Sequence, residues 1–148
     1  FYYSGFARNN LGRYEEAIPY FEKAISLQPF KADYYFDLGN SYRHLKLFDN
    51  ALYQFRKTLE IDPNHYKAHN NMGTIFWALG ATEQARSSFE KVLSIKSDIP
   101  AIHNNLAAIH IKNRDYKKAI PYLEKLISLQ PENVNAQKLL QFSMGQTR

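Results

Sequence analysis

The amino-acid sequence predicts an all-α protein, a right-handed solenoid of stacked antiparallel helix pairs. Two observations support this prediction. Residues of one type recur every 34 positions, and each 34-residue unit carries two apolar stripes with helical spacing. The chain has 148 residues, of which 45% are apolar and 22% are charged, so a single folded domain of ordinary composition is expected.

The repeat is clearest in the prolines. Pro63 follows Pro29 by 34 residues and Pro131 follows Pro63 by 68, with Ser97 at the missing step. Four further sets share this register: Ala17, Ala51, Ala85 and Ala119; Phe21, Phe55, Phe89 and Leu123; Gly5, Gly39, Gly73 and Ala107; and Leu27, Ile61, Ile95 and Leu129. A fixed period in the range of about 20–50 residues indicates a stacked repeat architecture.

Residues 32–65 show how one unit is built. The apolar face of the first helix is formed by Tyr35, Leu38, Gly39 and Tyr42, and that of the second helix by Ala51, Leu52, Phe55 and Leu59. The small residues Gly39 and Ala51 are expected where the two helices approach closely. In the units on either side, Gly12 and Gly80 lie between the first and second helix and suit a left-handed helix end. The prolines end each second helix.

These residues resemble the tetratricopeptide repeat family, whose pattern of Leu-Gly, Tyr, Ala, Phe and Pro also recurs every 34 residues. The resemblance implies four repeats and a capping helix within one domain, residues 1–148. The repeats are residues 1–31, 32–65, 66–99 and 100–133, and the capping helix is residues 134–143. The chain departs from the pattern where Arg8 and His110 replace the aromatic residue found at Tyr42 and Phe76.

The resemblance also implies a protein-interaction scaffold or adaptor that binds a peptide segment of a partner in a concave groove. At 100° per residue, the face of each first helix opposite its buried stripe should line this groove. The expected groove residues are Phe36, Asp37, Asn40, Arg43, Lys67, Asn70, Asn71, Thr74, Trp77, Asn104, Asn105 and Lys112. Trp77 either anchors a partner in the groove or folds onto the neighbouring unit.

Asparagine is the most frequent of the expected groove residues. His69-Asn70-Asn71 recurs as His103-Asn104-Asn105, and a side-chain amide can both donate to and accept from a peptide backbone. The carboxylate clamp, with which some members of the family grip a C-terminal Asp or Glu, is matched only at Asn40, Asn71 and Lys67. Phe36, Ala101 and Asn105 stand where its remaining bases belong, so recognition of a terminal carboxylate is not expected.

Several other functions find no support in the sequence. There is no HExxH motif, Gly-rich phosphate loop or GxSxG elbow, so no enzyme, cofactor or metal is expected. His69 and His103 occupy the packing position of Tyr35, which favours a structural role over metal binding. The net charge of +5 is spread along the chain rather than clustered, which argues against nucleic-acid binding. No apolar run is long enough to insert into a membrane.

Two questions stay open at the level of sequence. The main alternative to peptide binding is self-association, in which open ends of the solenoid stack end to end; nucleic-acid binding ranks below both. The chain begins at Phe1 within structured-looking sequence, so a longer protein is expected, and its compartment is undetermined, with the cytoplasm slightly favoured.

Overall fold

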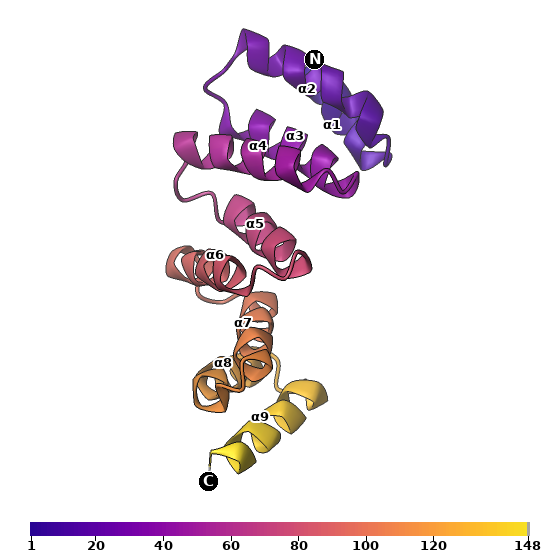
Figure 1. Ribbon diagram of the computed structural model, residues 1–148. Helices are drawn as coiled ribbons and strands as arrows, with labels where there is room; N and C mark the ends of the chain where they lie inside the picture. The colour runs from indigo at the N-terminus through magenta and orange to yellow at the C-terminus, as the bar shows by residue number, and fades with distance from the viewer. Residues whose placement is uncertain (148) are drawn as a thin grey trace.

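The computed structural model describes residues 1–147, and this part of the chain holds nine α-helices and no strand (Figure 1). The all-α prediction is confirmed. The helices are α1 (Tyr2–Asn10), α2 (Tyr14–Leu27), α3 (Ala32–His44), α4 (Phe48–Ile61), α5 (Tyr66–Ala78), α6 (Thr82–Ile95), α7 (Pro100–Lys112), α8 (Tyr116–Leu129) and α9 (Val134–Gln146).

Successive helices pack as pairs, and the pairs pack on one another in chain order. The pairs are α1 with α2, α3 with α4, α5 with α6, and α7 with α8, while α9 packs on α8. Figure 1 shows the result as an elongated stack, with the α1–α2 pair at one end and α9 at the other. Nearly all packing is therefore between neighbours along the chain, as in a repeat protein.

Close approach within the first three pairs depends on a phenylalanine set against a glycine. Phe55 is completely buried, and a Cβ atom added at Gly39 would lie 2.7 Å from its ring. The same clash would arise between Gly73 and Phe89, at 2.6 Å. In the last pair, a smaller leucine, Leu123, packs with an alanine, Ala107, so the exchange keeps the space filled.

A hydrogen bond that recurs along the chain ties the helix after each pair to the loop that follows that pair. The side chain at one position donates a hydrogen bond to the backbone carbonyl six residues earlier: Tyr35 to Pro29 (3.0 Å), His69 to Pro63 (3.0 Å), His103 to Ser97 (2.7 Å) and Gln137 to Pro131 (2.7 Å). Each bond satisfies a carbonyl in the loop between pairs. His69 and His103 therefore each hydrogen-bond the loop that precedes their helix.

The turns inside the pairs share one left-handed residue. Gly12 and Gly80 adopt φ angles of +73° and +75°, as the sequence predicts. Lys46 and Arg114 stand at the equivalent places and adopt φ angles of 60° and 59° without being glycine. Left-handed backbone is unfavourable for residues with a Cβ atom, so these two turns carry strain that the other two lack.

Helix α9 occupies the position of a first helix that has no described partner. It extends three residues beyond the expected end at 143, and its buried side adds Leu139 and Leu140 to the core of the α7–α8 pair. Together with α8, it borders a cleft of about 640 Å³ lined by Ile127, Gln137, Leu140, Gln141, Met144 and Gly145. None of the helices in residues 1–147 has the length and apolar character needed to cross a membrane.

Candidate functional site

The predicted groove residues gather in a cleft between α1, α2, α3 and α5, which we call the α3 cleft. It has a volume of about 410 Å³ and is lined by Phe6, Asn9, Asn10, Tyr14, Phe36, Asp37, Asn40, Arg43, His44, Lys67, Asn70 and Asn71. Seven of the twelve expected groove residues are among them: Phe36, Asp37, Asn40, Arg43, Lys67, Asn70 and Asn71. The expected Thr74, Trp77, Asn104, Asn105 and Lys112 lie outside this cleft.

The α1 and α2 side of the α3 cleft adds residues beyond the twelve that were predicted. Phe6, Asn9 and Asn10 come from the exposed face of α1, where the same helical spacing places them. Tyr14 comes from the start of α2, a second helix, and its ring stacks on the His44 imidazole with centroids 4.4 Å apart. Groove positions inferred only from first helices could not include it.

Several polar groups in the α3 cleft are already paired with one another. Asn71 Nδ2 donates to Asn40 Oδ1 at 2.8 Å, which joins α5 to α3. The Tyr2 hydroxyl donates to Asp37 Oδ2 at 2.7 Å, and Asn9 Nδ2 donates to the Asp37 carbonyl at 3.2 Å. Burial raises the pKa of Asp37, and burial together with the Asp37 contact raises the pKa of Tyr2.

The two cations of the α3 cleft are not paired with acids. Arg43 is half-buried, and its Nε atom is enclosed without a hydrogen-bond partner within residues 1–147. The one hydrogen bond that its guanidinium forms within residues 1–147 is to His44 Nε2, at 3.2 Å. Burial lowers the pKa of Arg43, and burial followed by the nearby Arg43 charge lowers the pKa of His44. Burial and the Arg43 charge thus both disfavour the charged form of the imidazole. Lys67 is exposed and forms no ion pair in the described residues.

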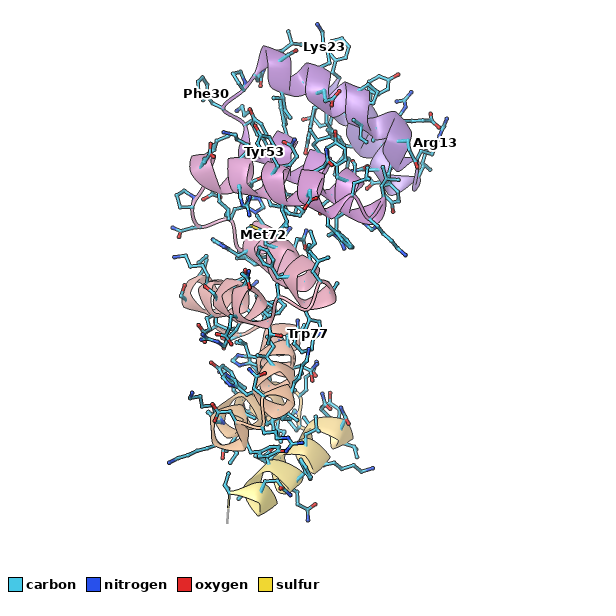
Figure 2. All side chains as sticks on the ribbon, viewed as in Figure 1. Arg13, Lys23, Phe30, Tyr53, Met72 and Trp77 are labelled. Atoms are coloured by element: carbon cyan, nitrogen blue, oxygen red, sulfur yellow. The ribbon has the colours of Figure 1, made fainter. Side chains whose placement is uncertain are left out.

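The expected aromatic anchors are more enclosed than a free groove surface would be. Phe36 is half-buried and packs against Phe55, with ring centroids 5.8 Å apart, and His65, at 4.6 Å. Figure 2 shows Trp77 at the α7 end of α5. Its side chain is 37% exposed, and Lys112 Nζ of the next pair lies 4.7 Å from the ring centroid. Trp77 therefore contacts the neighbouring pair and stays partly exposed to solvent.

The other expected residues outside the α3 cleft are on α5 and α7. The exposed Thr74 uses its hydroxyl to donate to the Asn71 carbonyl at 2.8 Å. Asn104 is exposed and Asn105 is half-buried. The asparagines differ in their contacts, because the Asn71 amide is held by Asn40, whereas the Asn105 side chain has no equivalent asparagine bond among the described residues.

A larger cleft lies between α6, α7 and α8, and we call it the α7 cleft. It has a volume of about 680 Å³ and is lined by Glu83, Arg86, Glu90, His103, His110, Asn113, Asp115, Lys118, Pro121 and Tyr122. Two departures from the repeat place polar groups here. His110 stands where Tyr42 and Phe76 occur, and Arg86 stands where Leu52 and Ile120 occur.

The charges of the α7 cleft are paired within the chain. Arg86 bonds Glu83 and Glu90, each at 2.7 Å, and these contacts raise the pKa of Arg86. Lys118 bonds Asp115 at 2.9 Å. The His110 ring stacks nearly parallel on Tyr122, with centroids 5.6 Å apart, and burial lowers the pKa of His110. No group of three or more His, Asp or Glu side chains suited to a metal ion occurs among the described residues.

Comparison with protein families accounts for most of the chain. Three family models match, all described as tetratricopeptide repeat, over residues 9–66, 66–99 and 100–133. The two later matches have the same bounds as the expected third and fourth units. A search of curated protein sequences found no match.

Many solved structures share this fold at low sequence identity. MamA 41-end from Desulfovibrio magneticus RS-1 has a TM-score of 0.82 and 20% identity, covering 94% of this chain and 78% of that chain. YrrB, described as a TPR protein with an unusual peptide-binding site, has a TM-score of 0.75 and 23% identity, covering 84% and 64%. A chain of the APC/C hetero-tetramer Cut9-Hcn1 has a TM-score of 0.77 and 17% identity, covering 95% and 28%. The paired helices, the 34-residue register and the three family matches together show that the chain belongs to the tetratricopeptide repeat family.

Proposed function

We propose that this protein is a non-catalytic interaction scaffold that binds an extended peptide segment of a partner in the α3 cleft. The observation that carries the proposal is the set of side-chain amides and cations that this cleft presents to solvent. Asn10 is exposed and Asn70 is half-buried, and neither forms a side-chain hydrogen bond within residues 1–147. An extended peptide has one donor and one acceptor per residue, which such amides can match.

The likeness to YrrB supports peptide binding as a class of function. That protein is described as having an unusual peptide-binding site, and this chain shares its fold. The family membership points the same way, because stacked helix pairs create long surfaces that suit extended segments. The choice of the α3 cleft rests on this chain's own residues.

The proposal is tested by comparing two asparagines one unit apart. Peptides of about a dozen residues are selected from a random display library on the 148-residue chain, and their affinities are measured by fluorescence anisotropy. Asn71→Ala should weaken binding about tenfold or more, because it removes the Oδ1 atom and the second N–H that Asn71 keeps beside its bond to Asn40 in the α3 cleft. Asn105→Ala, at the same place in the next unit but outside the cleft, should leave the affinity within about twofold. Equal losses would show a ligand that runs along both units, and no loss in either variant would contradict the proposal.

Trp77→Ala reports how far the bound segment extends. Trp77 lies outside the α3 cleft and contacts Lys112, so a segment confined to the cleft should keep its affinity in this variant. A tenfold loss would show that the segment continues along α5 toward α7.

Self-association is the second candidate, and a separate observation favours it. Helix α9 borders an apolar cleft at one end of the stack, and the other end exposes Phe1 (61% exposed) and Tyr3 (82% exposed). Exposed apolar groups at both ends suit end-to-end contact between copies. Sedimentation velocity over a wide range of concentration should then show species larger than the monomer, and Met144→Glu should abolish them. A monomer at every concentration would exclude this candidate.

A further inference from the structure

We propose that the segment bound in the α3 cleft is acidic, with the side-chain carboxylate of one Asp or Glu seated on the Arg43 guanidinium. This inference rests on the proposed function and names the chemistry of its partner. Arg43 lines the cleft, is half-buried, and has no acidic partner within residues 1–147.

A half-buried charge without a counter-ion is unfavourable in the free protein. Removing a guanidinium from water costs free energy unless hydrogen bonds and an opposite charge replace the water. Arg43 receives neither in full within residues 1–147, because its Nε atom is enclosed without a partner and its terminal nitrogen bonds a histidine ring rather than an acid. A carboxylate restores both, since its two oxygens match the planar guanidinium.

A second cation extends the same preference along the cleft. Asn71 of α5 is bonded to Asn40 of α3, and the chain reverses twice between these helices, so they run in roughly the same direction. Arg43 lies three residues after Asn40, and Lys67 lies four residues before Asn71. The two cations therefore lie on opposite sides of this contact, about 10 Å apart along the helix axes. Because the two helices also lie about 10 Å apart laterally, the full separation is roughly 14 Å. An extended chain covers that distance in about four residues, so two acidic residues about four positions apart fit best.

The remaining charge in the cleft argues for a polypeptide rather than a nucleic acid. Asp37 also lines the α3 cleft, and its carboxylate is held by the Tyr2 hydroxyl. A phosphate backbone needs a continuous row of cations, and Asp37, six residues before Arg43 and nearly level with Lys67 along the helix axes, would repel it. A peptide can keep a neutral residue beside Asp37 while its acids reach Arg43 and Lys67.

The test measures charge at Arg43 and charge in the peptide together. Peptides selected on the 148-residue chain are made as C-terminal amides with a fluorescent label, so that only side chains supply carboxylates. The selected peptides should be rich in Asp and Glu, and one Glu→Gln or Asp→Asn change should weaken binding tenfold or more. Arg43→Gln should cause a similar loss and make acidic and amide peptides bind alike. Arg56→Gln, which removes an equal charge from α4 outside the cleft, should change affinity by no more than about twofold.

The outcomes separate this inference from the proposed function. Peptides that bind wild type, lose affinity in Asn71→Ala and tolerate every acid-to-amide change would overturn the acidic preference while leaving the groove intact. Selection of no peptide, or of peptides insensitive to Asn71→Ala, would count against the proposed function itself. If Arg43→Gln melts well below wild type, the acid-to-amide comparison on the wild-type protein still decides. Displacement of the peptide by oligothymidylate at equal affinity would also overturn the inference.

Discussion

The two clefts differ in what their arginines contact. In the α7 cleft, Arg86 bonds Glu83 and Glu90, and Lys118 bonds Asp115. In the α3 cleft, Arg43 and Lys67 meet no acid in the described residues. The α7 cleft is the larger, at about 680 Å³ against about 410 Å³, yet its charges are already neutralised.

The volume of a cleft and its capacity to bind a ligand are therefore separate properties. Polar substitutions in the α7 cleft, such as Arg86 and His110, are compensated by partners within the chain. The α3 cleft keeps uncompensated donors and charge, so a ligand gains more there than it loses by displacing water. The unpaired group, rather than the volume, identifies the proposed site.

Phe55→Ala should have the largest effect, because it removes the support of the α3 cleft. Phe55 is completely buried and packs against Gly39 on the buried side of α3. Its truncation should lower the free energy of unfolding by about 3–5 kcal/mol in a urea melt. A loss below about 1 kcal/mol would show that this contact is not part of the core.

Replacing the left-handed residue of either strained turn with glycine should stabilise the folded protein by the same amount. Lys46 ends the turn after α3 and Arg114 ends the turn after α7, and both have left-handed φ angles. Lys46→Gly and Arg114→Gly should each raise the free energy of unfolding by up to about 1 kcal/mol. Lys23→Gly, within α2, is the control and should instead be destabilising. A response in only one of the turns would mean that the two regions differ in backbone strain as well as in charge pairing.

Removing each arginine should affect stability in different ways. Arg86→Gln leaves Glu83 and Glu90 unpaired on a partly exposed helix, so the free energy of unfolding should fall by about 0.5–1 kcal/mol. Arg43→Gln removes a half-buried charge without an acidic partner, so the free energy of unfolding should stay level or rise. Urea melts at neutral pH measure both. An equal loss in the two variants would show that Arg43 is stabilised by contacts as good as those of Arg86.

The smallest expected effect is the pH dependence contributed by His110. Burial lowers its pKa in the folded state, so the unfolded chain binds protons more readily, and stability should fall as the pH decreases through the ordinary histidine range near about 6.5. Arg86, Glu90, Asp115 and Lys118 face the same ring and modify the shift. His110→Phe should reduce the slope of stability against pH. His44, whose pKa is also lowered, contributes equally to wild type and to His110→Phe. An unchanged slope in His110→Phe would contradict the lowered pKa of His110.

The fold could be predicted from the sequence because its determinants repeat. Gly39 and Phe55 recur at one spacing, and close helix packing needs that pairing in every unit, so the pattern stands out from variable surface residues. The same register predicts the left-handed turns at Gly12 and Gly80, but it gives no sign that Lys46 and Arg114 adopt the same conformation. A backbone angle is inherited from the repeat geometry even where the side chain does not favour it.

The candidate site could be predicted only in part, because helical spacing gives direction and not contact. It predicts Asn40, Asn71 and Arg43 on one surface, and all three line the α3 cleft. It could not show that Asn71 is bonded to Asn40, or that Arg43 lacks an acid, since both depend on how far neighbouring pairs are rotated. The α7 cleft was visible only as a departure from the repeat at His110, without any indication of its size.

The central claim is that a peptide binds in the α3 cleft and not in the α7 cleft, and backbone amide chemical shifts test it most directly. A selected peptide is titrated into the ¹⁵N-labelled 148-residue chain. The largest shift changes should fall at Asn40, Arg43 and Asn71, on α3 and α5. Changes concentrated at His103, His110 and Tyr122 would place the ligand in the α7 cleft and contradict the claim.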